Sequence, residues 1–337
     1  MKIFIKVLKW IGISIGSILG IIIIAGLSFR LFGPKPNPPG QLVDVGGFNL
    51  HIRTAGEKST KPTLVLETGQ GIPTEHYHWI SEGLKDSMRV VRYDRAGIGY
   101  SDLSGTPRDP ETIARELHTL LEKAGEKPPY IMAGHSFGGL YIRVFASLYP
   151  EEVVGMAFLD SSHPDQRERL EMSSRPDLTM ILNAIAVLGD IGVLGLFDRY
   201  NGSMLRVDEL PAEVNERFYD YTLNGKYIRG LRDEASWDKA GYDQARKAIE
   251  FDSIPIRVFT AGKKYNGKDA NPKWVELQRE IANLSTDNKH ILVDGHHNSI
   301  YTTKENADLI CQEILQMTEK RERLHYQAVA TPIINNQ

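Results

Sequence analysis

The hydrophobic pattern divides the chain into an apolar front and a long alternating body. Residues Trp10 to Phe29 form a run of about twenty residues without a charged side chain, which as a helix spans about 30 Å of hydrocarbon. The charges that flank this run are three lysines before it and two basic residues soon after it: Lys2, Lys6, Lys9, Arg30 and Lys35. Because positive residues stay in the cytoplasm, we expect residues 1–32 to form a transmembrane anchor with a cytoplasmic N-terminus and an extracytoplasmic body.

A cleaved signal peptide is the alternative, and it would make the protein secreted. Signal peptides usually have a shorter apolar region followed by a small-x-small cleavage site. The nearest match, Gly26-Leu27-Ser28, is a poor one. Residues 33–41 follow as a Pro-rich linker that ends the helix and stays extended.

In the body, short apolar runs alternate with segments of helical period. Residues 42–52 alternate around Gly46-Gly47 and predict a β-hairpin. Six later runs predict buried strands, at residues 63–67, 89–93, 130–133, 153–159, 256–260 and 290–293. Helical-period segments such as 111–124 and 139–149 separate them. This alternation predicts an α/β fold with a mostly parallel sheet and helices on both faces.

One segment interrupts the alternation. Residues 165–252 contain helical patterns and no convincing strand, so we expect an inserted helical cap between core parts 42–164 and 253–317, with a polar tail at 318–337. Inside the cap, the segment from Met180 to Phe197 is unusually apolar and contains three glycines. It is either the buried side of a lid helix or an apolar surface that faces an acyl chain or the bilayer.

Composition narrows the possible classes of protein. The 337 residues are 41% hydrophobic and 25% charged, which excludes a disordered chain, a collagen and a multi-pass membrane protein. A net charge of -3 gives no basic face for nucleic acid. Cys311 is the single cysteine, so a Cys-rich metal site is excluded, and the pairs His76/His78 and His296/His297 lack a third ligand. We therefore expect neither a metal nor a cofactor.

The strongest chemical signal is the sequence Gly134-His135-Ser136-Phe137-Gly138, which follows a predicted strand and opens a predicted helix. A tight strand-to-helix turn needs glycines close to the serine and lifts its hydroxyl to the end of the sheet. The backbone N–H of Phe137, at the start of the helix, would then face a developing oxyanion. The pattern predicts Ser136 as a nucleophile.

From about residue 43 to 317 the chain resembles the α/β-hydrolase fold family. Besides the serine turn, Thr68-Gly69-Gln70-Gly71 looks like the family's oxyanion loop, with Thr-Gly where His-Gly is more usual. The segment from Tyr93 to Asp102 resembles its Asp-Arg-x-Gly-x-Gly-x-Ser turn. The resemblance implies a mostly parallel central sheet flanked by helices with an inserted cap, and the backbone N–H of Gln70 as second oxyanion donor. It implies much less about the substrate.

The same resemblance implies the chain order serine, acid, histidine. The base should follow the last strand, where His297 fits the family's pattern better and His296 is the alternative base. The acid usually follows the penultimate strand, but the first carboxylate there is Asp269. Some members carry the acid one strand earlier, so we favour Asp160, with Asp269 as the alternative acid and Asp165 behind it.

These residues predict a serine hydrolase that cleaves a carboxylic ester, including a lipid-like acyl ester, through an acyl-enzyme on Ser136. An amidase or peptidase with the same triad is one alternative. A ligand-binding or signalling protein that kept this fold without catalysis is another. Dehalogenation is disfavoured, because it needs a carboxylate in place of the serine. Glu67, at the end of the first buried strand, has no role in this interpretation.

Overall fold

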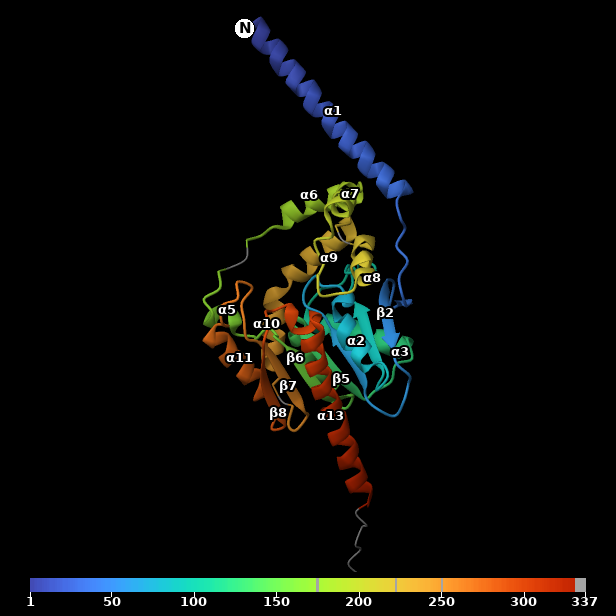
Figure 1. Ribbon diagram of the computed structural model, residues 1–337, viewed down its shortest axis with the longest axis vertical. Helices are drawn as coiled ribbons and strands as arrows, with labels where there is room; N and C mark the ends of the chain where they lie inside the picture. The colour runs from blue at the N-terminus through green and yellow to red at the C-terminus, as the bar shows by residue number, and fades with distance from the viewer. Residues whose placement is uncertain (174–175, 222, 250, 331–337) are drawn as a thin grey trace, which may run out of the picture.

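The computed structural model describes residues 1–173, 176–221, 223–249 and 251–330, and its centre is an eight-stranded sheet (Figure 1). The strands are β1 (Gln41–Asp44), β2 (Asn49–Ala55), β3 (Thr63–Glu67), β4 (Val90–Asp94), β5 (Tyr130–His135), β6 (Val153–Leu159), β7 (Ile256–Ala261) and β8 (Asn288–Val293). Their order is β1-β2-β4-β3-β5-β6-β7-β8. Strand β2 pairs antiparallel with β1 and β4, whereas every other pair is parallel. The predicted hairpin and mostly parallel sheet are confirmed.

Helices cover both faces of the sheet, which explains why the central strands are apolar without alternation: all residues of β3, β4 and β5 are buried. One face carries α3 (Pro110–Lys123), α4 (Gly138–Leu148) and α11 (Pro272–Ala282). The other carries η1 (Thr74–Tyr77), α2 (His78–Leu84), α12 (Ser299–Thr302) and α13 (Lys304–Ala330). Local sequence sets the helix starts: before α3, the Asp109 carboxylate accepts from the N–H of Glu111 and Thr112, and Pro110 is the first helical residue.

In the described residues between β6 and β7 the chain forms helices and no strand. They are α5 (Gln166–Arg169), α6 (Thr179–Asp190), α7 (Val193–Asn201), α8 (Ala212–Asn215), η2 (Glu216–Asp220), α9 (Gly225–Ser236) and α10 (Asp238–Lys247). Helices α6 to α9 lie at the upper end of the domain (Figure 1). We refer to the helices α5 to α10 as the cap.

The N-terminal helix α1 (Lys2–Phe32) extends away from the domain as a single rod (Figure 1). It is long and apolar enough to cross a membrane, although a signal sequence meets the same criterion. Its only buried residue is Gly26. The base of α1 packs against α7 and the turn that precedes it.

Part of the segment predicted as a polar tail at 318–337 is helical, since helix α13 continues to Ala330. Residues 318–330 include several Glu, Lys and Arg, which favour helix even without an apolar face. Residues 331–337 lie outside the described residues.

Candidate active site

The site begins at the carboxyl ends of two neighbouring strands. Strands β5 and β6 are paired up to His135 and Leu159, so the next residues, Ser136 and Asp160, are neighbours at the sheet edge. Both have left-handed backbones, with φ of 53° at Ser136 and 44° at Asp160. Such conformations cost about 1–3 kcal/mol in a residue with a Cβ and concentrate at functional sites.

The turn around Ser136 depends on its two glycines. A Cβ on Gly134 would lie 2.5 Å from the carbonyl oxygen of Gly138, and a Cβ on Gly138 would lie 2.4 Å from that of Glu67. Any larger residue at either position would push strand β5, helix α4 and strand β3 apart. This close approach is the physical reason for the Gly-x-Ser-x-Gly spacing.

His297 comes from the loop between β8 and α12, and its Nδ1 lies 2.6 Å from Oδ2 of Asp160. The Asp160 side chain is 4% exposed, whereas the His297 side chain is 33% exposed. The carboxylate is therefore shielded and the imidazole is open on one side. Within the described residues no hydrogen bond joins the Ser136 hydroxyl to His297, and such catalytic bonds often tighten only when substrate binds.

The other oxygen of Asp160 is held by two donors. Its Oδ1 accepts from the backbone N–H of Ala261 at 3.0 Å and from the indole Nε1–H of Trp274 at 2.7 Å. These bonds fix the rotation of the carboxylate and leave Oδ2 for His297. The sequence does not predict Trp274 as a site residue, because a tryptophan within an amphipathic helix is normally part of the hydrophobic core.

The alternative site residues lie elsewhere. Asp269 is an exposed residue whose carboxylate pairs with Lys263 at 2.8 Å. Asp165 pairs with Arg246, also at 2.8 Å. The His296 ring packs on Tyr265 with 4.5 Å between ring centroids. Of the candidate acids and bases, the structure brings together Asp160 and His297.

His135 lies inside the serine turn, but its ring binds the backbone of another loop and is not placed to act as a base. Its Nε2 lies 2.9 Å from the carbonyl oxygen of His297, so the Nε2–H donates to the loop that carries His297. Burial lowers the pKa of His135 well below its ordinary value, which keeps the ring neutral. The residue links the β5 turn to the histidine loop.

The predicted oxyanion donors come from two segments, the residue after Ser136 and the loop after β3. Phe137 directly precedes Gly138, the first residue of α4, so its N–H is one of the helix-end amides that lack an intrahelical acceptor. Gln70 lies in the loop after β3, next to Gly69, where a Cβ would lie 3.2 Å from the Cβ of Ser136. The Gln70 side chain donates to the carboxylate of Asp238 at 2.7 Å. This contact ties the loop to the cap.

A buried guanidinium holds the same loop from behind. Arg95 donates to the carbonyl oxygens of Thr68 and Gly69, both at 2.8 Å. It also pairs with Glu67 at 2.5 Å, and Glu67 accepts a short hydrogen bond from the Tyr93 hydroxyl. Glu67, which the sequence left unexplained, is therefore a counter-charge for Arg95.

Glu234 on α9 completes this network from the cap. Its carboxylate accepts from Arg95 Nε at 2.7 Å and from Nη2 at 3.0 Å, and Oε2 also accepts from the backbone N–H of Gly71 at 2.8 Å. The side chains of Arg95, Glu67 and Glu234 are each at most 1% exposed. The loop after β3 is thus held between the sheet and the cap by buried charges. No local sequence signal pairs Glu234 with a loop more than 160 residues earlier.

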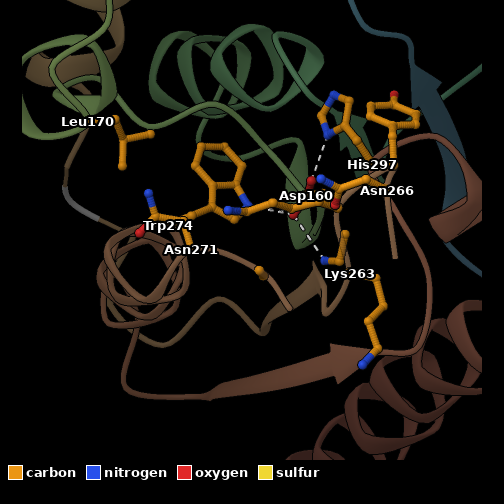
Figure 2. Close-up of a pocket in the computed structure, with 11 residues that line it drawn as sticks. Asp160, Leu170, Lys263, Asn266, Asn271, Trp274 and His297 are labelled. Carbon is orange, nitrogen blue, oxygen red and sulfur yellow. Dashed lines mark hydrogen bonds and ion pairs between the residues drawn. The ribbon is translucent and has the colours of Figure 1, made fainter. Parts of the chain in front are cut away.

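A cavity of about 480 Å³ opens beside the Asp160–His297 pair (Figure 2). Figure 2 shows Trp274 and Asn271 on one side, and Lys263 and Asn266 on the other. Its surface is mostly apolar carbon with a few amide and ammonium groups, as expected for a small-molecule site. Ser136 is not part of its lining. Within the described residues, no three His, Cys, Asp or Glu side chains converge as a metal site.

His76 is buried beside the rings of Phe218 and Tyr301, and burial lowers its pKa to about 4. The unfolded chain should titrate this group near 6.5, so between about pH 6.5 and pH 4 the unfolded state takes up a proton that the folded state refuses. We therefore predict that the free energy of unfolding falls as the pH drops through this window, by on the order of 2 kcal/mol from this group between pH 7 and pH 5.

Urea unfolding of wild type and His76→Gln at the two pH values tests this. The variant should lose less stability on acidification than wild type. Equal losses in the two proteins would show that His76 is not the source.

Comparison with known proteins places the fold in a family. A sequence model of the alpha/beta hydrolase fold matches residues 69–190. The uncharacterized protein YqjL of Bacillus subtilis is 34% identical over 243 residues, which cover 72% of this chain and 79% of YqjL. An AB hydrolase superfamily protein of Gibberella zeae is 29% identical over 267 residues, covering 70% of this chain and 81% of that protein. The chain belongs to the α/β-hydrolase fold family.

A solved structure agrees at the level of fold. The thermophilic esterase from Thermogutta terrifontis superposes with a TM-score of 0.56 at 18% identity, covering 83% of this chain and 99% of the esterase. At this identity the likeness concerns the fold alone.

Proposed function

We propose that the protein is a serine hydrolase that cleaves carboxylic esters through an acyl-enzyme on Ser136. The observation that carries this proposal is the 2.6 Å contact between His297 Nδ1 and Asp160 Oδ2, at the sheet edge where Ser136 also lies. A hydroxyl needs a base, and the base needs a fixed orientation and a counter-charge. These three side chains supply those parts.

In the acylation step, His297 Nε2 takes the proton of the Ser136 hydroxyl as its oxygen attacks the ester carbonyl carbon. The backbone N–H groups of Gln70 and Phe137 donate to the oxygen that becomes negative. His297 then gives the proton to the leaving alkoxide, the carbon–oxygen bond breaks and the alcohol departs. The Asp160 carboxylate orients His297 and stabilises the imidazolium.

Deacylation repeats these steps with water. His297 removes a proton from a water molecule, the hydroxide oxygen attacks the acyl carbon, and the bond to Ser136 breaks. The proton returns to Ser136, and the carboxylic acid leaves. The complete reaction consumes one ester and one water molecule and releases an alcohol and a carboxylic acid.

The domain division and the membrane topology belong to the same proposal. Residues 1–32 would anchor the protein with the N-terminus in the cytoplasm, and the linker 33–41 would lead to a catalytic domain outside, made of 42–164 and 253–317 with the cap at 165–252. The long apolar helix α1 supports an anchor. Cleavage after α1 would instead release a secreted enzyme.

A fluorophosphonate probe tests the nucleophile, because only an activated serine displaces its fluoride. We expect one label per wild-type chain and none in Ser136→Ala. Ser162→Ala, a serine after the neighbouring strand β6, is the matched control and should label fully. An unlabelled folded wild type, or equal labelling of Ser136→Ala, would refute the proposal. Turnover of a p-nitrophenyl ester against the matching p-nitroanilide separates esterase from amidase.

A further inference from the structure

Helix α6 is apolar on two opposite sides, but the domain covers only one of them. Residues such as Leu182 and Ala186 pack on α9, against Tyr227 and Ile228. The fit is close: a Cβ on Gly189 would lie 2.5 Å from the backbone nitrogen of Gly225. A helix that is hydrophobic all round is normally enclosed on all sides.

The outer side of α6 and the adjoining side of α7 carry large apolar side chains without cover. On α6 they recur at positions i, i+1, i+7 and i+8, which share one side of a helix. We call this surface the apolar face; its members are Met180, Ile181, Val187, Leu188, Phe197 and Tyr200. Met180 is 84% exposed, Phe197 59% and Tyr200 89%. Large apolar side chains that are exposed together on two consecutive helices indicate an interaction site.

The apolar face adjoins the helix that is able to cross a membrane. A Cβ on Gly26 of α1 would lie 2.7 Å from the side chain of Val193, and a Cβ on Gly192 would lie 2.3 Å from the carbonyl oxygen of Gly26. Phe29 of α1 lies against Gly195 in the same way. The turn between α6 and α7 and the start of α7 therefore touch α1 directly.

The position along α1 at which α7 touches it indicates what covers the apolar face. Gly26 precedes Phe29, the last residue of the uncharged run, by three residues, and at 1.5 Å per residue it lies about 4.5 Å inside the end of the run. Arg30 and Lys35 are the first charged residues after this run, and they would lie at the level of the headgroups. If α1 spans the bilayer, the start of α7 lies at the boundary between headgroups and hydrocarbon.

We propose that the apolar face of α6 and α7 docks into the outer leaflet of the membrane that holds α1, so that the enzyme takes lipid esters from that leaflet. The inference rests on the anchor and the esterase of the proposed function. Amphipathic helices bind in this way, with the apolar side submerged by about 5–10 Å. The docked helix α6 packs on α9, and α9 carries Glu234, which binds the oxyanion loop.

Two features favour docking over a second membrane span. Helices α6 and α7 meet at an angle of 81°, so they do not form one rod. At the last residue of α6, Asp190 forms a close ion pair with Arg229 of α9. That ion pair holds the end of α6 on the polar side of the domain.

Depth-dependent fluorescence quenching tests the docking on the full chain in phosphatidylcholine vesicles. A nitrobenzoxadiazole dye is attached to Met180→Cys or Tyr200→Cys, and the vesicles carry lipid with a doxyl quencher on carbon 5 of its acyl chain. Cys311 is buried, and burial raises the pKa of its thiol to about 12, so it does not compete for the dye. We expect at least twofold quenching at both positions.

Two further positions make the outcomes distinguishable. Ile21→Cys reports the anchor itself. Glu151→Cys changes an exposed residue just before the amino end of β6, opposite to the strand end that leads into Asp160, and should remain unquenched. Quenching at Ile21 without quenching at Met180 and Tyr200 overturns the docking and leaves the anchor intact. A lack of quenching at Ile21 removes the anchor and the docking together. Blue-shifted but unquenched dyes at Met180 and Tyr200 would mean that protein covers the face, which also overturns the proposal.

Activity gives an independent measurement. In the double variant Met180→Asp/Tyr200→Asp, the kcat/KM for a long-chain ester in vesicles, divided by that for a soluble short ester, should fall about tenfold. Leu292→Asp, which changes a 60% exposed leucine on β8, is the matched control and should keep the wild-type ratio. An unchanged ratio in the double variant contradicts the docking. Loss of both activities in the wild type would instead refute the proposed esterase.

Discussion

Asp160→Asn is expected to lower kcat for a short soluble ester by about 10⁴-fold, the size of effect seen when the acid of a serine triad loses its charge. The amide can still accept from Ala261 and Trp274 through its oxygen, so the side chain should keep its place. Its NH₂ group would then face His297 Nδ1, where Oδ2 now accepts. The imidazole would be held in the wrong tautomer and its positive form would lose a counter-charge.

The control for this change is Asp269→Asn, the other candidate acid. Its pair with Lys263 is exposed, and such pairs contribute little. We expect kcat within about twofold of wild type in this variant. Stopped-flow or steady-state assays with a p-nitrophenyl ester measure both. An active Asp160→Asn protein together with an inactive Asp269→Asn protein would reverse the assignment of the acid.

Arg95→Met is expected to destabilise the fold by about 3–5 kcal/mol, because it strands two buried carboxylates without their counter-charge. Glu67 and Glu234 would lose that partner, and the carbonyl oxygens of Thr68 and Gly69 would lose a donor. The oxyanion loop should then be less well held. We therefore also expect kcat to fall, by about 10–100-fold, in the protein that remains folded.

Arg246→Met on the cap is the matched comparison. Arg246 forms an ion pair with Asp165 in which both side chains are at least 40% exposed. Its loss should cost less than about 1 kcal/mol. Urea titration in detergent gives the free energy of unfolding for each variant. Equal losses in the two variants would show that the buried network does not stabilise the protein more than a surface pair does.

The features that could be predicted from the sequence are those set by short stretches of chain. Strands β3 and β6 were predicted with their observed bounds, at residues 63–67 and 153–159, and β4, β5, β7 and β8 to within two residues at each end. The predicted hairpin at 42–52 ends three residues before β2 does. The serine turn was predicted because a tight turn has no room for a Cβ beside the serine. The short distances that a Cβ would have at Gly134 and Gly138 show this. Each of these patterns involves only residues that are close together in the sequence, so no knowledge of distant contacts is needed to recognise them.

Contacts between side chains that are far apart in the sequence could not be predicted from the sequence alone. The choice between Asp160 and Asp269 depended on which strand end meets the His297 loop, a separation of 137 residues. Trp274 was missed as a partner of Asp160, and Glu234 as a partner of Arg95, for the same reason. In each case the partner is a common residue whose role comes only from where its helix packs.

By itself, the sequence determined the strands, the serine turn and the apolar character of α1 and of the segment from Met180 to Phe197. Only the tertiary structure decided how these pieces act together. It placed Asp160 beside His297, gave Glu67 a buried guanidinium to neutralise, and packed the turn between α6 and α7 against the base of α1. The physical reason is that apolar periodicity specifies which surfaces must be covered, whereas the packing of distant elements specifies what covers them.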